Sequence, residues 1–280
     1  MKKISRRSFL AAAGLSVAAL ALTACGGSAS STASSVASSA AASSEAASTS
    51  AVAGELTTVE AGKLTMATNA TFPPYEMTTD AGEFEGIDIE TAQAIADKLG
   101  LELQIDDMDF DAALLSVQQG KADIVMAGVT VTDERKAVMD FSDSYATGIQ
   151  SIIVPEGSDI ASPDDLAGKK IGTQRGTTGY IYCSDDFGDE NVVAYDDGLT
   201  AVQALNNGQV DAVVIDNAPA KEFVAANPGL VILDTSYAEE DYAIGMAKGS
   251  SLEDAVNAAL EELKADGTLQ AIVDKYITAE

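Results

Sequence analysis

Short apolar segments alternate with amphipathic helical segments between residues 63 and 129, and this order constrains the fold more than any other feature of the chain. Strands are expected at 63–68, 101–105 and 122–129, and helices at 88–99 and 110–119. The glycines at positions 100 and 120 follow the helical segments, where helices commonly end. Strand, helix, strand, helix, strand is typical of a parallel sheet that helices cover on both faces. The sequence therefore predicts an α/β fold.

The third of these strands leads into a short helix whose first turn contains an arginine. Thr132 is a suitable N-cap, and Asp133 and Glu134 occupy the first turn, where the helix dipole favours acids. Arg135 follows them, although the dipole disfavours a cation there. We therefore expect Arg135 to bind an anion, to which Thr130 and exposed backbone N–H groups can also donate. The alternative is an ordinary surface ion pair between Arg135 and a neighbouring acid.

A second α/β series occupies the rest of the chain. Strands are expected at 150–154, 170–173, 192–195, 212–215, 231–233 and 242–247. Helices are expected to begin at Thr178 and to span 199–206, 217–226, 252–265 and 268–276. The strands at 150–154 and 242–247 are expected to run side by side. We therefore interpret the folded part as two lobes joined by two crossing strands. Lobe 1 comprises residues 61–150 and 245–280, and lobe 2 comprises residues 151–244.

Residues 1–24 have the three regions of an export signal. Four basic residues precede an apolar run at 9–22, which is too short for a comfortable membrane span. The twin arginines at positions 6 and 7 resemble a Tat-type signal. Leu22-Thr23-Ala24-Cys25 resembles a bacterial lipobox, in which cleavage before Cys25 leaves this cysteine lipidated. The alternative is a small-residue cleavage site with an incidental cysteine. Residues 25–60 are mostly Ser, Ala, Thr and Gly, which predicts a flexible tether.

The composition excludes several function classes. The chain has no histidine, so catalysis that depends on an imidazole is excluded. If Cys25 is the anchor, Cys183 has no partner for a disulfide, and a zinc site is not expected either. We expect Cys183 to pack as a small apolar residue on its helix. The net charge of −28 predicts repulsion from nucleic acid and from anionic membranes.

Two further motifs imitate ligand-binding loops but fail on spacing. Residues 172–179 are glycine-rich like a phosphate loop but lack its Gly-Lys-Ser/Thr ending. The acids at 107, 109 and 111 imitate a calcium loop. That loop needs a glycine where Ala112 stands and a bidentate acid where Gln118 stands. We therefore expect neither a nucleotide nor a metal, and no cofactor.

The order of several short motifs resembles the family-3 extracellular solute-binding proteins, the polar amino-acid-binding proteins of ABC importers. The motifs are Phe72-Pro73-Pro74-Tyr75-Glu76, Gly86-Ile87-Asp88-Ile89, Ala122-Asp123-Ile124, Thr132-Asp133-Glu134-Arg135, Phe141-Ser142, Gly176-Thr177-Thr178, Asp211-Ala212-Val213 and Ala265-Asp266-Gly267-Thr268. The resemblance covers nearly all of residues 64–277 and includes members that bind glutamine, lysine-arginine-ornithine or histidine. It implies a monomer with the two-lobe periplasmic-binding-protein fold of type II, the Venus flytrap, with two crossover hinge strands.

The resemblance also implies a role for each residue that contacts the ligand. Arg135 is expected to hold the α-carboxylate of the ligand through a bidentate guanidinium contact. Thr130 and Thr178 are expected to add hydrogen-bond donors to the same carboxylate. Asp216 is expected to bind the α-ammonium group, assisted by the carbonyl of Gly128. From the residues alone, Asp216 is equally well explained as the N-cap of the helix that follows it.

Two aromatic residues are implied to enclose the side chain of the ligand. Phe72 and Phe110 are expected to sandwich it, although an aromatic residue at a helix start such as Phe110 is more often part of a core. Closure around the ligand is expected to bend the two crossing strands, near residues 149–153 and 243–247. Both lobes then contribute to the site, and the ligand stabilises the closed form because it contacts both.

Two neutral residues depart from the pattern of the family. Members that bind cationic ligands usually carry an aspartate just before the aromatic loop, where this chain has Asn69. The first residue of the loop in the second lobe is also neutral, Gln174. A neutral polar ligand side chain such as that of glutamine is therefore expected at least as much as that of lysine or arginine. Glu76 or Asp109 could still neutralise a cation.

Our interpretation is a lipid-anchored receptor on the extracytoplasmic face of the bacterial cell membrane. It is expected to capture a free polar L-amino acid, to deliver it to the permease subunits of an ABC transporter, and to have no enzymatic activity. One alternative is a dehydratase-like enzyme on the same fold, for which Glu76 is the only obvious acid besides the one that pairs with the ammonium group. The other is a sensor that presents its ligand-bound form to a signalling receptor.

Overall fold

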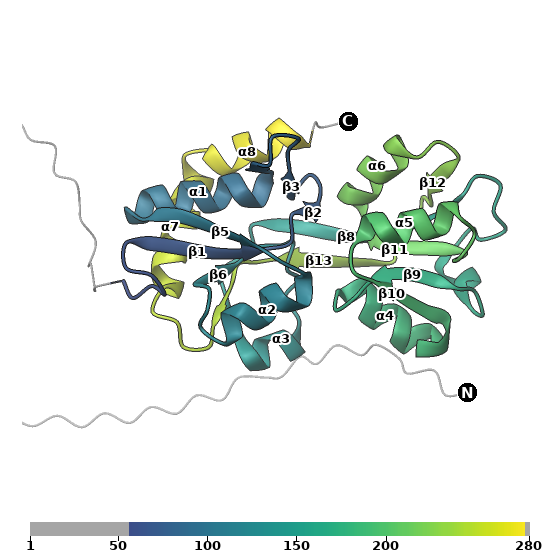
Figure 1. Ribbon diagram of the computed structural model, residues 1–280, viewed down its shortest axis with the longest axis horizontal. Helices are drawn as coiled ribbons and strands as arrows, with labels where there is room; N and C mark the ends of the chain where they lie inside the picture. The colour runs from purple at the N-terminus through teal and green to yellow at the C-terminus, as the bar shows by residue number, and fades with distance from the viewer. Residues whose placement is uncertain (1–55, 278–280) are drawn as a thin grey trace, which may run out of the picture. The chain divides into compact units, whose positions relative to one another are not determined.

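The computed structural model describes residues 56–277, which form two large β-sheets flanked by helices (Figure 1). The predicted export signal at 1–24, the lipobox cysteine Cys25 and all but the end of the predicted tether at 25–60 lie outside the described residues. None of the helices in the described part has the length and hydropathy needed to span a bilayer. The α/β class and the order of elements agree with the sequence prediction.

The first sheet combines strands from the start of the chain with two later ones. Its spatial order is β5 (Glu102–Asp107), β1 (Lys63–Thr68), β6 (Ile124–Val125), β14 (Gly245–Ala247) and β7 (Met139–Phe141). The strand β1 runs parallel to β5 and β6, whereas β14 runs antiparallel to β6 and β7. The apolar faces of α1 (Ile87–Leu99) and α7 (Glu253–Ala265) cover one side, and α2 (Phe110–Gln118) covers the other. The first sheet is therefore mixed rather than purely parallel, because β14 returns from the second sheet.

The second sheet repeats this layered arrangement. Its spatial order is β10 (Val192–Tyr195), β9 (Ile171–Gln174), β11 (Ala212–Asp216), β8 (Ala146–Pro155) and β12 (Leu230–Ile232). The helices around it are α4 (Thr178–Phe187), α5 (Gly198–Asn206), α6 (Asn217–Ala226) and the short η2 (Asp189–Asn191). Cys183 on α4 is fully buried in the core, and this burial raises the pKa of its thiol to about 12. The cysteine therefore packs as the small apolar residue that the sequence predicts.

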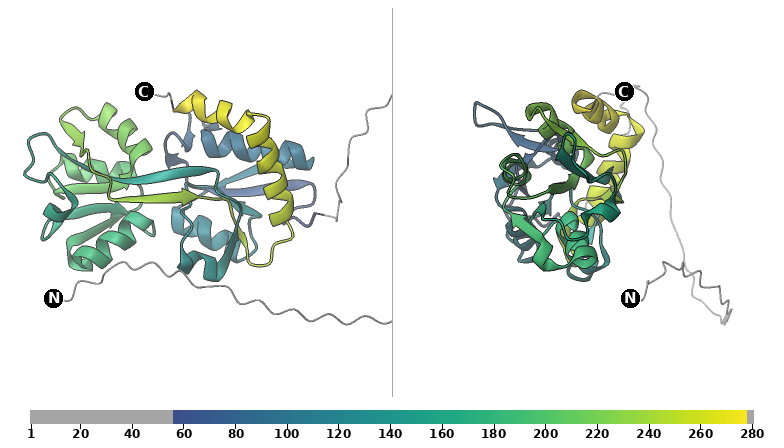
Figure 2. Two further views of the ribbon diagram at one scale, coloured as in Figure 1. Left: turned by 180° about the vertical axis from the view of Figure 1, so that it is seen from behind. Right: turned by 90° about the vertical axis from the view of Figure 1, so that its right-hand side faces the viewer.

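Two antiparallel strands connect the sheets and lie side by side in Figure 2. The first is β8, and the second is β13 (Ala238–Tyr242), which pairs with the first half of β8. The prediction of one strand over 242–247 was wrong, because the segment is divided between β13 and β14. The reason lies in the backbone hydrogen bonds of residues 243–244, which go to Val129 and Ser142 instead of to a strand of either sheet.

A small three-stranded sheet lies beside the first sheet. It consists of β2 (Thr71–Phe72), β3 (Glu76–Thr78) and β4 (Phe84–Glu85). The prolines that interrupt the predicted strand form the turn between β2 and β3, with a cis peptide bond between Pro73 and Pro74. A Cβ atom on Gly86 would lie 2.1 Å from the carbonyl oxygen of Tyr75, so only glycine fits the start of α1. This sheet fixes the positions of Phe72 and Glu76.

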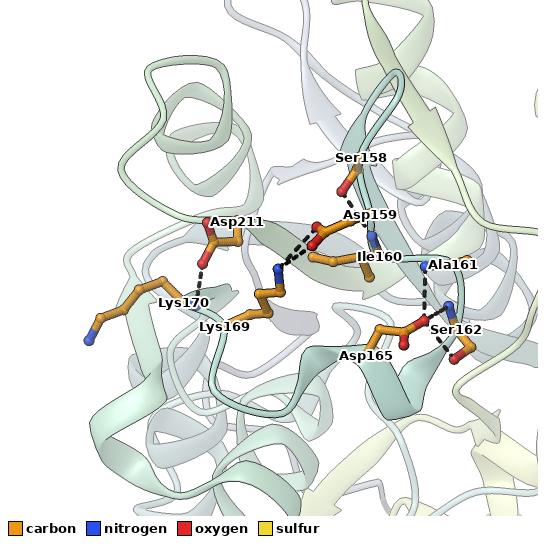
Figure 3. A network of polar contacts seen from close by, with 9 residues as sticks. All are labelled: Ser158, Asp159, Ile160, Ala161, Ser162, Asp165, Lys169, Lys170 and Asp211. Carbon is orange, nitrogen blue, oxygen red and sulfur yellow. Dashed lines mark hydrogen bonds and ion pairs between the residues drawn. The ribbon is translucent and has the colours of Figure 1, made fainter.

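The remaining helices are short or follow α7. They are α3 (Asp133–Val138), α8 (Thr268–Tyr276) and the 3₁₀-helix η1 (Pro163–Leu166). A polar network stabilises the loop that contains η1 (Figure 3). The carboxylate of Asp165 accepts hydrogen bonds from the backbone N–H groups of Ala161 and Ser162, at 3.1 and 2.9 Å. Lys169 binds Asp159 at 3.0 Å. None of the residues drawn in Figure 3 lines the cavity described below.

Candidate functional site

One cavity is lined by residues from both large sheets and from the small one. The lining residues are Asn69, Phe72, Glu76, Phe110, Ala127, Gly128, Thr130, Arg135, Gln174, Thr177, Thr178 and Asp216. Every residue that the sequence analysis selected as a ligand contact is among them. The chain therefore brings together side chains that lie almost 150 positions apart. The structure shows that these residues line one cavity, and the role of each toward a ligand stays a prediction.

Arg135 projects into this cavity from the short helix α3. Thr132 caps the helix as expected, and its hydroxyl accepts the backbone N–H of Arg135 at 3.2 Å. The guanidinium donates to the carbonyl of Thr130 at 2.7 Å and to that of Gly176, across the cavity, at 3.1 Å. It also lies over the ring of Phe110, 5.4 Å from the ring centre. In residues 56–277 no carboxylate lies within ion-pair distance of Arg135, which excludes the surface ion pair considered above.

The guanidinium of Arg135 therefore keeps donors for an anion. A guanidinium has five N–H donors, and two are used by the carbonyls of Thr130 and Gly176. The side chain is only 9 % exposed, so its charge has little water to stabilise it. A carboxylate that entered the cavity would form a charge-assisted and nearly desolvated contact with Arg135. The geometry is that of a small-anion site.

Asp216 stands at the N-cap position of α6, but its side chain makes no capping hydrogen bond. Instead, one carboxylate oxygen accepts the hydroxyl of Tyr242 and the other accepts Nε2 of Gln150 at 2.8 Å. Burial, reinforced by the charge of Glu240, raises the pKa of Asp216 to about 7. The capping explanation for Asp216 is therefore wrong. Its carboxylate lies at the cavity, where an ammonium group would stabilise its ionised form.

The two neutral amides that the sequence analysis singled out contact each other. Gln174 donates from Nε2 to Oδ1 of Asn69 at 2.8 Å, which joins β9 of the second sheet to the loop after β1 of the first. Asn69 also donates from Nδ2 to the carbonyl of Met108 at 3.0 Å. Asn69 and Gln174 bond to each other, so the contact between the two sheets is enough to explain why both side chains are neutral. Their neutrality is weak support for a neutral ligand side chain.

The sequence analysis missed Glu240, which contacts the cavity residue Thr130. Oε2 of Glu240 accepts the hydroxyl of Thr130 at 3.1 Å and Nε2 of Gln150 at 3.0 Å. Glu240 stands in an acidic run that has the composition of an exposed surface. Along β13, however, Glu240 and Tyr242 are buried while their neighbours are exposed. This period of two is the signal that marks Glu240 as inward-facing.

Two further acids are buried beside the cavity. The carboxyl of Glu76 is inaccessible to solvent, and within the described residues neither of its oxygens has a hydrogen-bond partner. Burial and the neighbouring Asp88 raise its pKa well above the usual range. Asp88 accepts the N–H of Gly128 at 3.0 Å, and burial raises its pKa to about 6. In residues 56–277 no three His, Cys, Asp or Glu side chains are grouped so that they could hold a metal ion.

The raised pKa of Asp216 predicts a pH dependence of stability. When an acid has a higher pKa in the folded state than in the unfolded state, folding is favoured at low pH and weakened as the pH rises to the folded value. In protein freed of bound amino acid, Asp216→Asn should remove this contribution. Urea unfolding should therefore show that, from pH 5 to pH 8, the free energy of unfolding of the wild type falls by about 2 kcal/mol relative to that of the variant. Parallel pH profiles for the two proteins would contradict the prediction.

Comparison with known proteins agrees with this arrangement. A family model described as bacterial extracellular solute-binding proteins, family 3, matches residues 64–279. The L-cystine-binding protein TcyJ of Escherichia coli K12 is 34 % identical over 226 residues, which cover 79 % of this chain and 85 % of that protein. The arginine-binding extracellular protein ArtP of Bacillus subtilis is 33 % identical over 228 residues, which cover 78 % and 87 % of the two chains.

A solved structure shows the same fold. The arginine-, lysine-, histidine-binding protein ArtJ of Geobacillus stearothermophilus superposes with a TM-score of 0.75 at 34 % identity, and the match covers 78 % of this chain and 96 % of that one. The two-sheet architecture described above is therefore the two-lobe periplasmic-binding-protein fold of type II. The chain belongs to the family-3 bacterial extracellular solute-binding proteins.

Proposed function

We propose that the protein captures a polar L-amino acid outside the cytoplasm and delivers it to the permease of an ABC transporter. The observation that carries this proposal is the pair of buried, opposite charges in one cavity, Arg135 and Asp216. The α-carboxylate of an amino acid would bind the unused donors of Arg135, with Thr178 at the start of α4 beside it. The α-ammonium group would bind Asp216. A zwitterion satisfies both residues at once, whereas a simple anion or cation satisfies only one.

The ligand would hold two lobes together. We assign residues 61–150 and 245–280 to lobe 1 and residues 151–244 to lobe 2, each built around one large sheet. Arg135 and the aromatics Phe72 and Phe110 belong to lobe 1, and Thr178 and Asp216 belong to lobe 2. Because the amino acid contacts both lobes, it would stabilise the closed arrangement. The hinge would lie along β8 and β13, where these strands of the second sheet lead to the first sheet.

The buried charges favour an amino acid with a positively charged side chain. Arg135 is the only buried cation in the described part of the chain, whereas five acids are buried there, and four of them, Glu76, Asp88, Asp216 and Glu240, line the cavity or contact residues that line it. An amino acid with a neutral side chain adds one ammonium and one carboxylate group, so the buried acids still outnumber the buried cations. A cationic side chain lying between Phe72 and Phe110 would offset one more carboxylate. Glu76 lines the cavity, and its carboxyl has no hydrogen-bond partner among residues 56–277. The names of ArtP and ArtJ, which refer to arginine, lysine and histidine, support this ligand class.

We infer that the protein binds its ligand without chemically changing it. Family membership supports a solute-binding role, and Glu76 is better explained as a ligand contact than as a catalytic acid. A dehydratase-like enzyme would need a proton donor beside the reacting carbon, and this chain has no histidine to supply one. Presentation of the ligand-bound form to a signalling receptor remains the second candidate. It uses the same site and differs only in the membrane partner.

We also propose that the mature chain is a monomeric lipoprotein. Cleavage after Ala24 would leave Cys25 as a lipidated N-terminus, and residues 25–60 would connect this anchor to the binding domain. The protein would then remain at the extracytoplasmic face of the membrane, close to its permease. A single acyl chain gives only marginal membrane binding, so stable anchoring would require more than one chain on Cys25.

Removal of the Arg135 guanidinium tests the proposed function. Arg135→Ala should weaken binding of L-arginine or L-glutamine, the two probes to be titrated by calorimetry, by about a hundredfold or more, because a buried charge-assisted contact is lost. Arg175→Ala is the matched control, since Arg175 is exposed and pairs only with Asp196. It should leave the affinity unchanged. If both variants bind as the wild type does, Arg135 does not hold the carboxylate.

Neutralisation of Glu76 tests the ligand class. Glu76→Gln should weaken binding of L-arginine by roughly tenfold to a hundredfold, the cost of losing a hydrogen bond to a charged group. Binding of L-glutamine should change little, because its amide does not need a negative charge. Glu85→Gln, on the exposed end of β4, is the control. Equal losses for the two amino acids would show that Glu76 does not contact the ligand side chain.

Replacement of the predicted lipidation residue tests the anchor. In a bacterial host that processes lipoproteins, the wild type should fractionate with membranes and resist extraction by high salt. Cys25→Ser should move the protein to the soluble extracytoplasmic fraction, while Cys183→Ser should leave its location unchanged. Retention of the Cys25→Ser variant in the membrane fraction would argue for another mode of attachment.

A further inference from the structure

Glu240 lies behind the two charged residues of the proposed site and contacts neither of them directly. It is 6 % exposed, and its neighbours Glu239 and Asp241 on β13 are exposed. One oxygen, Oε2, accepts the hydroxyl of Thr130 at 3.1 Å and Nε2 of Gln150 at 3.0 Å. The other oxygen, Oε1, is buried and has no hydrogen-bond partner within residues 56–277. A buried acid that leaves one oxygen unpaired requires an explanation.

The bond from Thr130 to Glu240 decides which role the hydroxyl of Thr130 can take toward a ligand. A hydroxyl has one proton and two lone pairs, and a carboxylate can only accept. The proton of Thr130 is therefore directed to Glu240, and the lone pairs of its oxygen remain available. Thr178 lies 3.5 Å from this oxygen. In this arrangement the hydroxyl of Thr130 accepts hydrogen bonds from a ligand, which suits an ammonium group and not a carboxylate.

The same acid also acts on Asp216 through Gln150. Nε2 of Gln150 donates to Oδ2 of Asp216 at 2.8 Å and to Oε2 of Glu240 at 3.0 Å, so both amide protons are used between two carboxylates. The Oε1 atom of Gln150 packs against Gly179, where an added Cβ atom would lie 2.8 Å from it, so glycine leaves the space that this side chain occupies. Glu240 and Asp216 are thus held as neighbouring acidic groups that share Nε2 of Gln150.

We propose that Glu240 is a specificity-determining positioning residue that makes the site require an α-ammonium group. It keeps Thr130 as a hydrogen-bond acceptor and adds a second negative charge behind Asp216, without contacting the ligand. This inference rests on the proposed function. Its consequence is discrimination against acids that have the same side chain and carboxylate but no α-amino group. Such compounds would satisfy Arg135 but leave the lone pairs of Thr130 and the carboxylate of Asp216 unpaired.

The test compares amino acids with their deaminated analogues. L-Arginine is paired with 5-guanidinopentanoate, and L-glutamine with 4-carbamoylbutanoate, and each is titrated by calorimetry into the ligand-free protein. The measured quantity is the ratio of the Kd of the deaminated compound to the Kd of the amino acid. Glu240→Gln can turn its NH₂ group to Thr130, which frees the hydroxyl proton for the carboxylate of the ligand. The ratio should then fall by about tenfold or more.

Two controls separate this role from general support of the fold. Glu239→Gln alters the exposed neighbour on the same strand and should leave the ratio unchanged. Thr130→Val removes the hydroxyl that Glu240 directs. It should lower the ratio by itself, and Glu240→Gln should lower the ratio less in that background than in the wild type. This second variant keeps the inference testable if Glu240→Gln does not fold.

Each outcome has a defined meaning. If Glu240→Gln weakens the amino acid and its deaminated analogue equally, or changes neither, the inference about Glu240 is wrong while the proposed function stands. If the wild type binds neither L-arginine nor L-glutamine, and no other amino acid raises its melting temperature, the proposed function itself fails. A lower ratio with a retained melting temperature supports the role proposed for Glu240.

Discussion

The burial of one guanidinium without a carboxylate is the constraint on which the rest of this site depends. Arg135 is held by backbone carbonyls of Thr130, on its own side, and of Gly176, across the cavity. Carbonyl dipoles offset part of the cost of burying a charge, but they do not neutralise it. A bound anion would stabilise such a residue, which is why we propose that Arg135 holds a carboxylate. The helix cap, the ring of Phe110 and the turn after β6 all hold the guanidinium where that anion would bind.

The strands that connect the two sheets also hold Asp216, which lines the cavity. Gln150 lies on β8, Glu240 and Tyr242 lie on β13, and all three bond to Asp216 or to each other. A change in the angle between the sheets must therefore move the groups that bind Asp216. Gly148 contributes to this tight fit, because a Cβ atom there would lie 2.5 Å from the ring of Tyr242. Hinge and ligand site share side chains, so neither can change independently of the other.

The sequence predicts the parts of this protein that depend on local chemistry. Local sequence patterns give the helices α1 to α8 and most strands of the two large sheets, but not β7, β13 or the small sheet of β2, β3 and β4. The misplaced cation after Thr132 leads to the prediction that Arg135 contacts an anion. The predictions that failed concern contacts between residues that lie far apart in the sequence. The division of residues 242–247 depends on hydrogen bonds to Val129 and Ser142, more than 100 positions away. The bond between Asn69 and Gln174 could not be predicted from their neutral side chains, and Glu240 was missed because its neighbours are acids that face water.

The excess of buried acid explains how the site can distinguish ligands by charge. Glu76, Asp88 and Asp216 have pKa values raised by burial, so without a cation nearby each keeps its proton to a higher pH than an exposed acid does. An ammonium group that enters the cavity replaces a proton as the partner of Asp216, and a cationic side chain can do the same at Glu76. A ligand without those cations leaves the protons in place and gains only the contact with Arg135. Under the proposed function, affinity would follow the number of positive groups that the ligand brings to defined positions, and not its net attraction to an acidic protein.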